Sequence, residues 1–207
     1  MRNDLGKIVK SVTLQGGLLG KKPKNLVLYE KGIVLHFKKN SCDYLFTEVA
    51  AIKTLDIFAP NPTSYSFDLF DVNNEKITSL DISYVQQTDA MLLLELHKRA
   101  VLGANFPADL RKRALPIDDT LSWDGTKLVR SGRKGIEEFS VEQIDAFVNR
   151  NGSFFFTFKE SKETLLVGVL FSPNCLMAIE ICRAIASLGT PRVALVFPDF
   201  EETQKLY

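Results

Sequence analysis

Residues 28–52, LYEKGIVLHFKKNSCDYLFTEVAAI, decide the fold of this chain because their layout returns in its second half. Within this stretch Gly32 and Phe46 stand 14 residues apart, and further along Gly125 and Phe139 stand 14 residues apart as well. Each pair is followed by two apolar strand patterns and then by a helical pattern. A period of about 90 residues is too long for a solenoid repeat, so the sequence predicts a tandem duplication of one compact domain.

The length fits two small globular domains. A chain of 207 residues accommodates two domains of about 100 residues, each large enough to fold alone. We expect one domain in residues 1–104, a second in 105–190, and an extra strand with a tail in 191–207. Residues 192–197 are expected to form an edge strand that bridges the two copies or pairs between chains in a homodimer, because an uncovered apolar edge invites aggregation.

Charge and hydropathy narrow the class of protein. The net charge is +1, so no field of one sign covers the molecule, and nucleic acid is not an expected partner. The N-terminus lacks the apolar core of a signal peptide, and the longest apolar run, residues 165–171, is too short to cross a bilayer. Cys42, Cys175 and Cys182 form no metal spacing and cannot all pair. We therefore expect a cytoplasmic protein with no transmembrane segment.

Strand patterns dominate the first copy. Breaks at Glu30-Lys31-Gly32 and at Asn73-Asn74 supply hairpin turns. In the second copy the aromatic run of residues 154–158 offers a stacking platform, but strand alternation turns two of its rings toward the core, which favours packing. Runs of β-branched and aromatic residues in the first copy predict strands near residues 7–14, 26–30, 33–37, 43–46, 49–57, 64–71 and 76–82.

One helix closes each copy. The first ends at Leu102-Gly103 and carries a broad apolar arc, with His97 at the border of that arc. The second ends at Leu188-Gly189, and Ser172 is expected to cap its start, with Pro173 in its first turn. A narrow polar arc predicts that this second helix is deeply buried. The arc contains Glu180, Arg183 and Ser187.

About seven strands and a C-terminal helix in each copy, with a long first loop, resemble the pleckstrin-homology (PH) superfold. The segments 28–33 and 46–52 also resemble bacterial PH-like domains of unassigned function, over about residues 5–103 and more loosely over 104–190. Thr47 replaces a tryptophan that is common in that motif, and neither helix carries the usual PH tryptophan. The resemblance implies a mainly β fold with helices (α+β): two partly open β-barrels of about seven antiparallel strands, each closed by an α-helix.

The resemblance also implies where an anionic ligand would bind. In phosphoinositide-binding members, basic side chains of the first loop and the next strand converge on phosphates. The matching loop here carries Lys21, Lys22 and Lys24. The second copy carries Arg111, Lys112 and Arg113 in a place that looks comparable. The family's arginine on the second strand is missing, and a solvated basic loop without a ligand is the competing interpretation.

The sequence offers only weak candidates for catalytic or metal-binding residues. His36 and His97 fit structural positions on a strand and a helix. The acidic residues around Asp71 lack the glycine and the terminal glutamate of an EF-hand, and a plain turn explains them. No nucleophile has a nearby base in a known motif, and the glycines before Lys21 do not form a P-loop. We expect no catalytic residues, no metal and no cofactor.

The resemblance, together with the lack of a recognisable catalytic motif, therefore implies a non-enzymatic binding or adaptor protein. PH-like domains bind rather than catalyse, and some accept a protein segment along a sheet edge or between a strand and the helix. A protein or peptide partner is the leading expectation. Three alternatives stay open: a peripheral membrane module that binds anionic lipid headgroups, a chromatin protein resembling double-PH histone chaperones but without their acidic tract, and an enzyme with an interdomain pocket.

Overall fold

The computed structural model describes residues 2, 4–15, 22–54, 63–133, 135–150, 153–159 and 161–189. The described chain is mainly β with two α-helices, which is the α+β class that the sequence predicts. Its strands form four antiparallel sheets, and none of these sheets closes on itself within the described residues. The predicted edge strand at 192–197 lies outside them.

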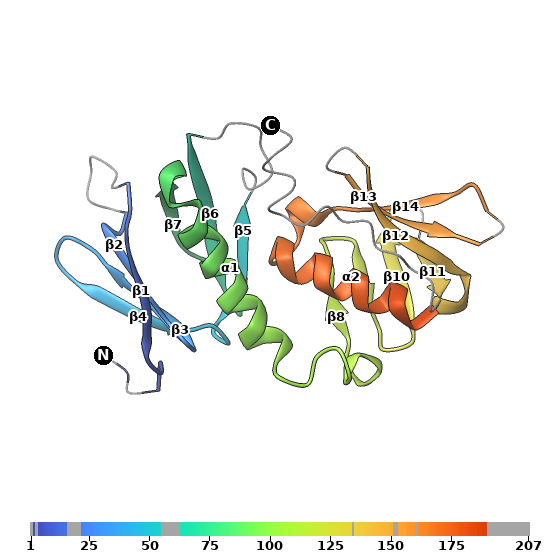
Figure 1. Ribbon diagram of the computed structural model, residues 1–207, viewed down its shortest axis with the longest axis horizontal. Coiled ribbons are helices and arrows are strands. Elements are labelled where there is room, and N and C mark those ends of the chain that lie inside the picture. The colour runs from blue at the N-terminus through green and yellow to red at the C-terminus, as the bar shows by residue number, and fades with distance from the viewer. Residues whose placement is uncertain are drawn as a thin grey trace. The chain divides into compact units, whose positions relative to one another are not determined.

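The chain divides into two compact units (Figure 1). Unit 1 contains residues 1–104 together with Pro173–Met177, and unit 2 contains Asn105–Ser172 and the chain from Ala178 onward. Unit 1 is therefore discontinuous in sequence. Its last five residues come from a part of the chain that the sequence pattern assigns to the second copy.

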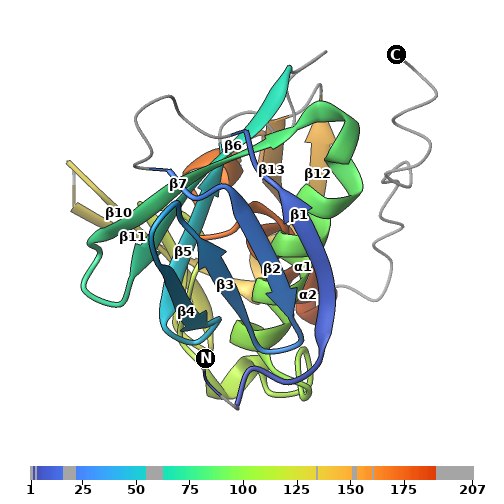
Figure 2. The ribbon, with the colours of Figure 1, turned by 90° about the vertical axis from the view of Figure 1, so that its left-hand side faces the viewer.

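Unit 1 consists of two sheets and a helix. Its first sheet is a four-stranded meander, seen face-on in Figure 2, and its second is a three-stranded meander. The strands of the first sheet are β1 (Ile8–Thr13), β2 (Asn25–Tyr29), β3 (Gly32–His36) and β4 (Ser41–Leu45). The second sheet and the helices that follow are β5 (Val49–Thr54), β6 (Ser64–Asp71), β7 (Lys76–Ser83), the 3-10 turn η1 (Tyr84–Gln86) and α1 (Gln87–Leu102).

Unit 2 repeats this order of elements, so both units share one topology. A four-stranded meander comes first, then a three-stranded one, then a helix. The first part contains η2 (Leu110–Lys112), β8 (Leu115–Pro116), β9 (Leu121–Trp123), β10 (Lys127–Gly132) and β11 (Gly135–Ser140). The second contains η3 (Val141–Gln143), β12 (Ile144–Arg150), β13 (Ser153–Phe158), β14 (Thr164–Val167), η4 (Val169–Phe171) and α2 (Cys175–Gly189), whose first turn belongs to unit 1.

The predicted strands of the first copy are confirmed within one or two residues at each end, except that the predicted end of the fifth, 55–57, lies outside the described residues. The hairpin turns also lie where the sequence places them, and Asn74 has the positive φ of 61° that a tight turn needs. In unit 2 the alternation prediction holds as well. Phe154 and Phe156 are buried, while Phe155 and Phe158 are partly exposed.

The register of the repeat differs from the one that the glycines suggest. In unit 1 the Leu45 amide donates to the Glu48 carboxylate (2.9 Å), and in unit 2 the Ser140 amide donates to the Gln143 side-chain oxygen (3.0 Å). Leu45 pairs with Gly32, whereas Ser140 pairs with Lys127. The two glycines thus lie in equivalent hairpins but two positions apart in register.

These glycines are required for different physical reasons. A Cβ on Gly32 would lie 2.3 Å from the Tyr44 carbonyl oxygen and 2.6 Å from a Leu5 methyl, so close packing excludes a side chain there. Gly125 has a φ of +102°, which L-residues rarely adopt. Aligning the two copies on the equal spacing of 14 residues therefore matches a glycine required by packing to a glycine required by its backbone angle. That alignment is wrong by two residues.

The start of α2 also differs from the prediction. Ser172 does not cap it, because its hydroxyl donates to the Val169 carbonyl inside η4 (2.6 Å). The cap is Asn174, whose side-chain oxygen accepts from the amides of Leu176 (3.0 Å) and Met177 (3.2 Å). Pro173 consequently lies just before the helix rather than in its first turn.

Replacing Gly32 by alanine is expected to lower the free energy of unfolding by about 1–3 kcal/mol, because the new methyl group meets a backbone oxygen that cannot move aside. Gly132→Ala is the matched control. Gly132 also lies in a strand, but a Cβ there has nothing within 4 Å, so a change within about 0.5 kcal/mol is expected. Urea denaturation followed by circular dichroism measures both variants, and equal losses would contradict this account of Gly32.

Candidate functional site

The predicted basic loop of unit 1 is only partly available to a ligand. Lys21 lies outside the described residues. The Lys22 ammonium contacts the Asp81 carboxylate at 2.5 Å, which ties it to β7. The Lys24 side chain is exposed. One of the two described lysines in this loop therefore already has an anionic partner within the protein.

The second predicted basic cluster is not in the equivalent loop. Arg111 and Lys112 lie on η2, and Arg113 follows directly, all three before β8. The Arg113 guanidinium lies 3.5 Å from the Asp109 carboxylate. The loop of unit 2 that matches the basic loop of unit 1 runs from β8 to β9. It is acidic, since it carries Asp118 and Asp119.

Asp118 uses both carboxylate oxygens to hold backbone groups. One oxygen accepts from the amides of Thr120 (2.7 Å) and Leu121 (2.8 Å), and the other accepts from the amide of Gly168 at the end of β14 (2.7 Å). This arrangement closes the β8–β9 loop onto the second sheet of unit 2. It presents negative charge where a phosphate-binding loop would present positive charge.

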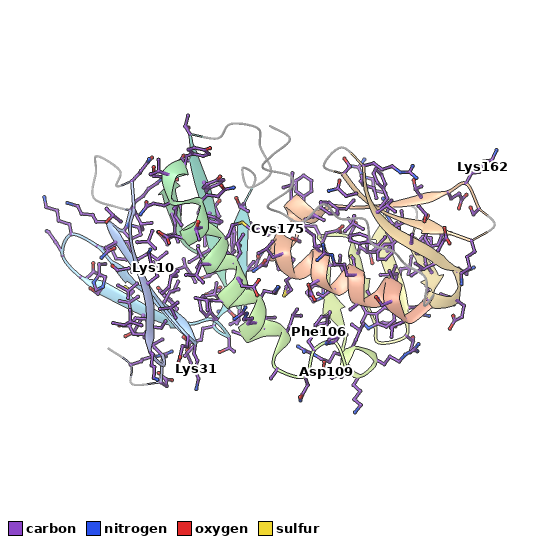
Figure 3. All side chains as sticks on the ribbon, in the orientation of Figure 1. Lys10, Lys31, Phe106, Asp109, Lys162 and Cys175 are labelled. Atoms are coloured by element: carbon purple, nitrogen blue, oxygen red, sulfur yellow. The ribbon has the colours of Figure 1, made fainter. Side chains whose placement is uncertain are left out.

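The remaining sequence candidates have structural roles. The Asp71 carboxylate accepts from the amides of Asn73 (2.9 Å) and Glu75 (2.8 Å), as the predicted plain turn requires. The described residues contain no group of three or more side chains suited to a metal ion. Cys175, labelled in Figure 3, and Cys182 are buried, and burial raises the pKa of the Cys175 thiol to about 12, so neither is an activated nucleophile.

A hollow of about 410 Å³ lies within unit 2, beside α2. It is lined on one side by residues of the connection before β8, including Pro107 and Leu110. On the other side it is lined by the narrow polar arc that the sequence predicts for α2, namely Glu180, Arg183 and Ser187. These three side chains offer no nucleophile with an adjacent base, so the hollow suggests no reaction.

The most specific arrangement of polar groups in the described chain lies in unit 1, between β5 and α1. We use the name latch for residues 173–177, and latch site for Ile52 of β5 with Leu94 and His97 of α1. The Ile52 amide donates to the Pro173 carbonyl oxygen at 2.7 Å. The edge strand β5 thereby donates a backbone hydrogen bond to a segment that is distant in sequence.

Asn174 makes the remaining contacts of the latch. Its side-chain nitrogen donates to the Leu94 carbonyl (2.9 Å) and to the His97 Nδ1 (3.0 Å), while its oxygen caps α2. Both Asn174 and His97 are completely buried. All hydrogen-bonding capacity of the amide group is thus used, as a buried polar side chain requires.

His97 is held in one tautomer. Its Nε2 lies 2.8 Å from the Val49 carbonyl oxygen, which can only accept, so Nε2 carries the proton. Nδ1 is then the acceptor for Asn174. Phe46, an uncharged residue, packs edge-on against the His97 ring at 6.0 Å between ring centroids. Burial lowers the pKa of His97, and the Val49 hydrogen bond opposes this only in part.

Sequence reasoning finds His97 as a structural histidine but misses Asn174. The available signal is the pair Pro173-Asn174 directly before an apolar helical run, because asparagine is among the strongest N-caps. Ser172 is also a good cap, and the sequence offers no way to choose between two candidates that are two residues apart.

Comparison with known proteins adds no family assignment, since no family model matches the chain and no curated protein matches it either. No helix in the described residues has both the length and the apolar character needed to cross a bilayer.

Replacing Asn174 by alanine is expected to cost about 3 kcal/mol of unfolding free energy, because it removes a helix cap and leaves two buried acceptors without a donor. Asn73→Ala is the control, since the Asn73 side chain is exposed in a turn. Hydrogen exchange should show faster opening of β5 and α1 in Asn174→Ala and unchanged exchange in Asn73→Ala. Equal protection of these elements in both variants would mean that the latch does not stabilise them.

The depressed pKa of His97 predicts acid sensitivity. A histidine in the unfolded chain titrates near pH 6.5, and the pKa of His97 in the folded protein is lower. The contribution of neutral His97 to the free energy of unfolding is therefore complete above about pH 6.5. It declines as the pH falls below that value, by at most about 1.4 kcal/mol per pH unit. His97→Gln cannot titrate there. The difference in unfolding free energy between the two proteins should be flat above pH 6.5 and shrink below it, and parallel curves would refute the prediction.

Proposed function

We propose that this chain is a non-enzymatic binding protein of two PH-like domains, and that its unit 1 recognises a protein segment at β5 and α1. The proposal rests on one observation above all. Unit 1 already holds such a segment, the latch, through a backbone hydrogen bond from β5 and two hydrogen bonds from Asn174 to α1. Strand-edge recognition of this kind supplies affinity through the main chain and specificity through side chains.

The topology of each unit supports the PH-like part of the proposal. Four antiparallel strands, three more, and a C-terminal helix agree in number with the seven strands and closing helix that the resemblance implies. In each unit a backbone amide takes part in a hydrogen bond between the loop after the first strand and the last strand of the second sheet or the residue that follows it. In unit 1 the Gln15 amide donates to the Asp81 carbonyl (2.9 Å), and in unit 2 the Gly168 amide donates to Asp118 (2.7 Å). Such links between two sheets are what a partly open barrel contains.

Binding of anionic lipid headgroups receives less support. Lys22 is paired with Asp81, and the loop of unit 2 in the matching position is acidic. An exposed lysine contributes about 1 kcal/mol near an anionic membrane, so the remaining basic side chains would bind weakly.

The proposal places the protein in the cytoplasm, a reducing compartment in which its three free cysteines stay reduced.

A displayed library of random peptides, screened against the full chain, tests segment recognition. The chain should be used as the wild type and as Asn174→Ala, in which the latch is weakened. Enriched peptides are expected to lose at least tenfold in affinity when His97→Leu is added, because that change removes the Nδ1 acceptor, one of the two acceptors at the latch site. Enrichment of no peptide, or binding that His97→Leu leaves unchanged, would refute the proposal. Thermal melting of each variant confirms that it is folded.

A further inference from the structure

The contacts of the latch indicate which features a partner segment needs in order to bind the latch site. Resting on the proposed function, we propose that unit 1 recognises a protein segment with asparagine immediately before a helix, and that residues 173–177 occupy the site in its place. The segment is defined by three requirements that the latch meets: a carbonyl at the first position, a carboxamide at the second, and buried apolar side chains in the first helical turn.

The carboxamide requirement follows from the hydrogen bonds. Asn174 gives two hydrogens to acceptors on α1 and receives two amide hydrogens from its own helix. Aspartate can cap a helix but has no hydrogen to give to the Leu94 carbonyl. Serine has only one, and glutamine is longer by one methylene. Asparagine is therefore the residue that satisfies all four partners in this geometry.

The flanking positions are specified unequally. The residue before the asparagine contributes its backbone carbonyl, which accepts from the Ile52 amide, and every residue type has such a carbonyl. In the following turn Cys175 and Met177 are each 2% exposed, while Leu176 is partly exposed. A partner segment should consequently carry any residue with a free backbone carbonyl, then asparagine, a small apolar residue, a tolerant position and a long apolar residue.

The latch competes with any such partner because it is part of the same chain. A tethered segment acts at an effective concentration on the order of millimolar, whereas a free segment is present at micromolar levels. A free segment can thus bind only when the latch contacts are weakened. Asn174→Ala removes two of the three contacts with the latch site while leaving Ile52, Leu94 and His97 intact, so it opens the site without altering it.

The test uses a fluorescent peptide of residues 170–182 in which both cysteines are replaced by alanine to prevent oxidation. Fluorescence anisotropy measures its binding to the full-length wild type and to full-length Asn174→Ala. The Asn174→Ala protein is expected to bind at least tenfold more tightly. A peptide carrying Asn174→Asp should bind that protein at least tenfold more weakly than the parent peptide, and a peptide carrying Pro173→Ala should bind about as well as the parent, since the carbonyl remains.

Three results separate this inference from the function on which it rests. Equal binding of the asparagine and aspartate peptides, or equal binding to both proteins, would overturn the inference of asparagine specificity. If library peptides bind in a His97-dependent manner but the latch peptide does not bind, segment recognition stands and its asparagine specificity is wrong. If neither kind of peptide binds Asn174→Ala, both are wrong. Because the specificity arm changes only the peptide, a folding defect in a protein variant cannot imitate its result.

Discussion

The hydrogen bonding of one buried amide organises unit 1. Asn174 joins a helix start, a helix carbonyl and a buried histidine, and each of these groups would be costly to leave unpaired away from water. The Val49 carbonyl of β5 fixes the tautomer of His97 that accepts from Asn174, so Asn174 is linked through His97 to β5. The helix α1, the strand β5 and the latch therefore share a single polar network inside an otherwise apolar core.

Most of the architecture could be predicted because local patterns agree with the tertiary structure. In β6, for example, Tyr65, Phe67 and Leu69 are buried in alternation, so the sequence pattern alone predicts which face of the strand points into the core. The repeat register could not be read in the same way. Gly32 and Gly125 occupy similar positions in the sequence pattern, but Gly32 is required by close packing and Gly125 by its positive φ. Only the strand pairing shows that the two positions are not equivalent.

The candidate site was harder to predict than the fold for a related reason. The basic clusters are conspicuous in sequence, yet Lys22 is neutralised by Asp81 from β7, a partner that no local pattern reveals. The residues that form the latch site are unremarkable in sequence: an isoleucine, a leucine and a histidine at the border of an apolar arc. Their importance arises from a contact across about 80 positions of sequence, which neither periodicity nor spacing encodes.

That long-range contact also sets an order of events during synthesis. The sheets and helix of unit 1 are complete in sequence once Ala104 has been added, but Asn174 follows about 70 residues later. At the usual elongation rate of roughly 5–20 residues per second, this leaves an interval of about 4–14 s. Throughout that interval the His97 Nδ1 and the Leu94 carbonyl lack their partner, so a nascent chain exposes the site before its own latch exists. A binding partner present at the ribosome would meet unit 1 before the latch has been synthesised.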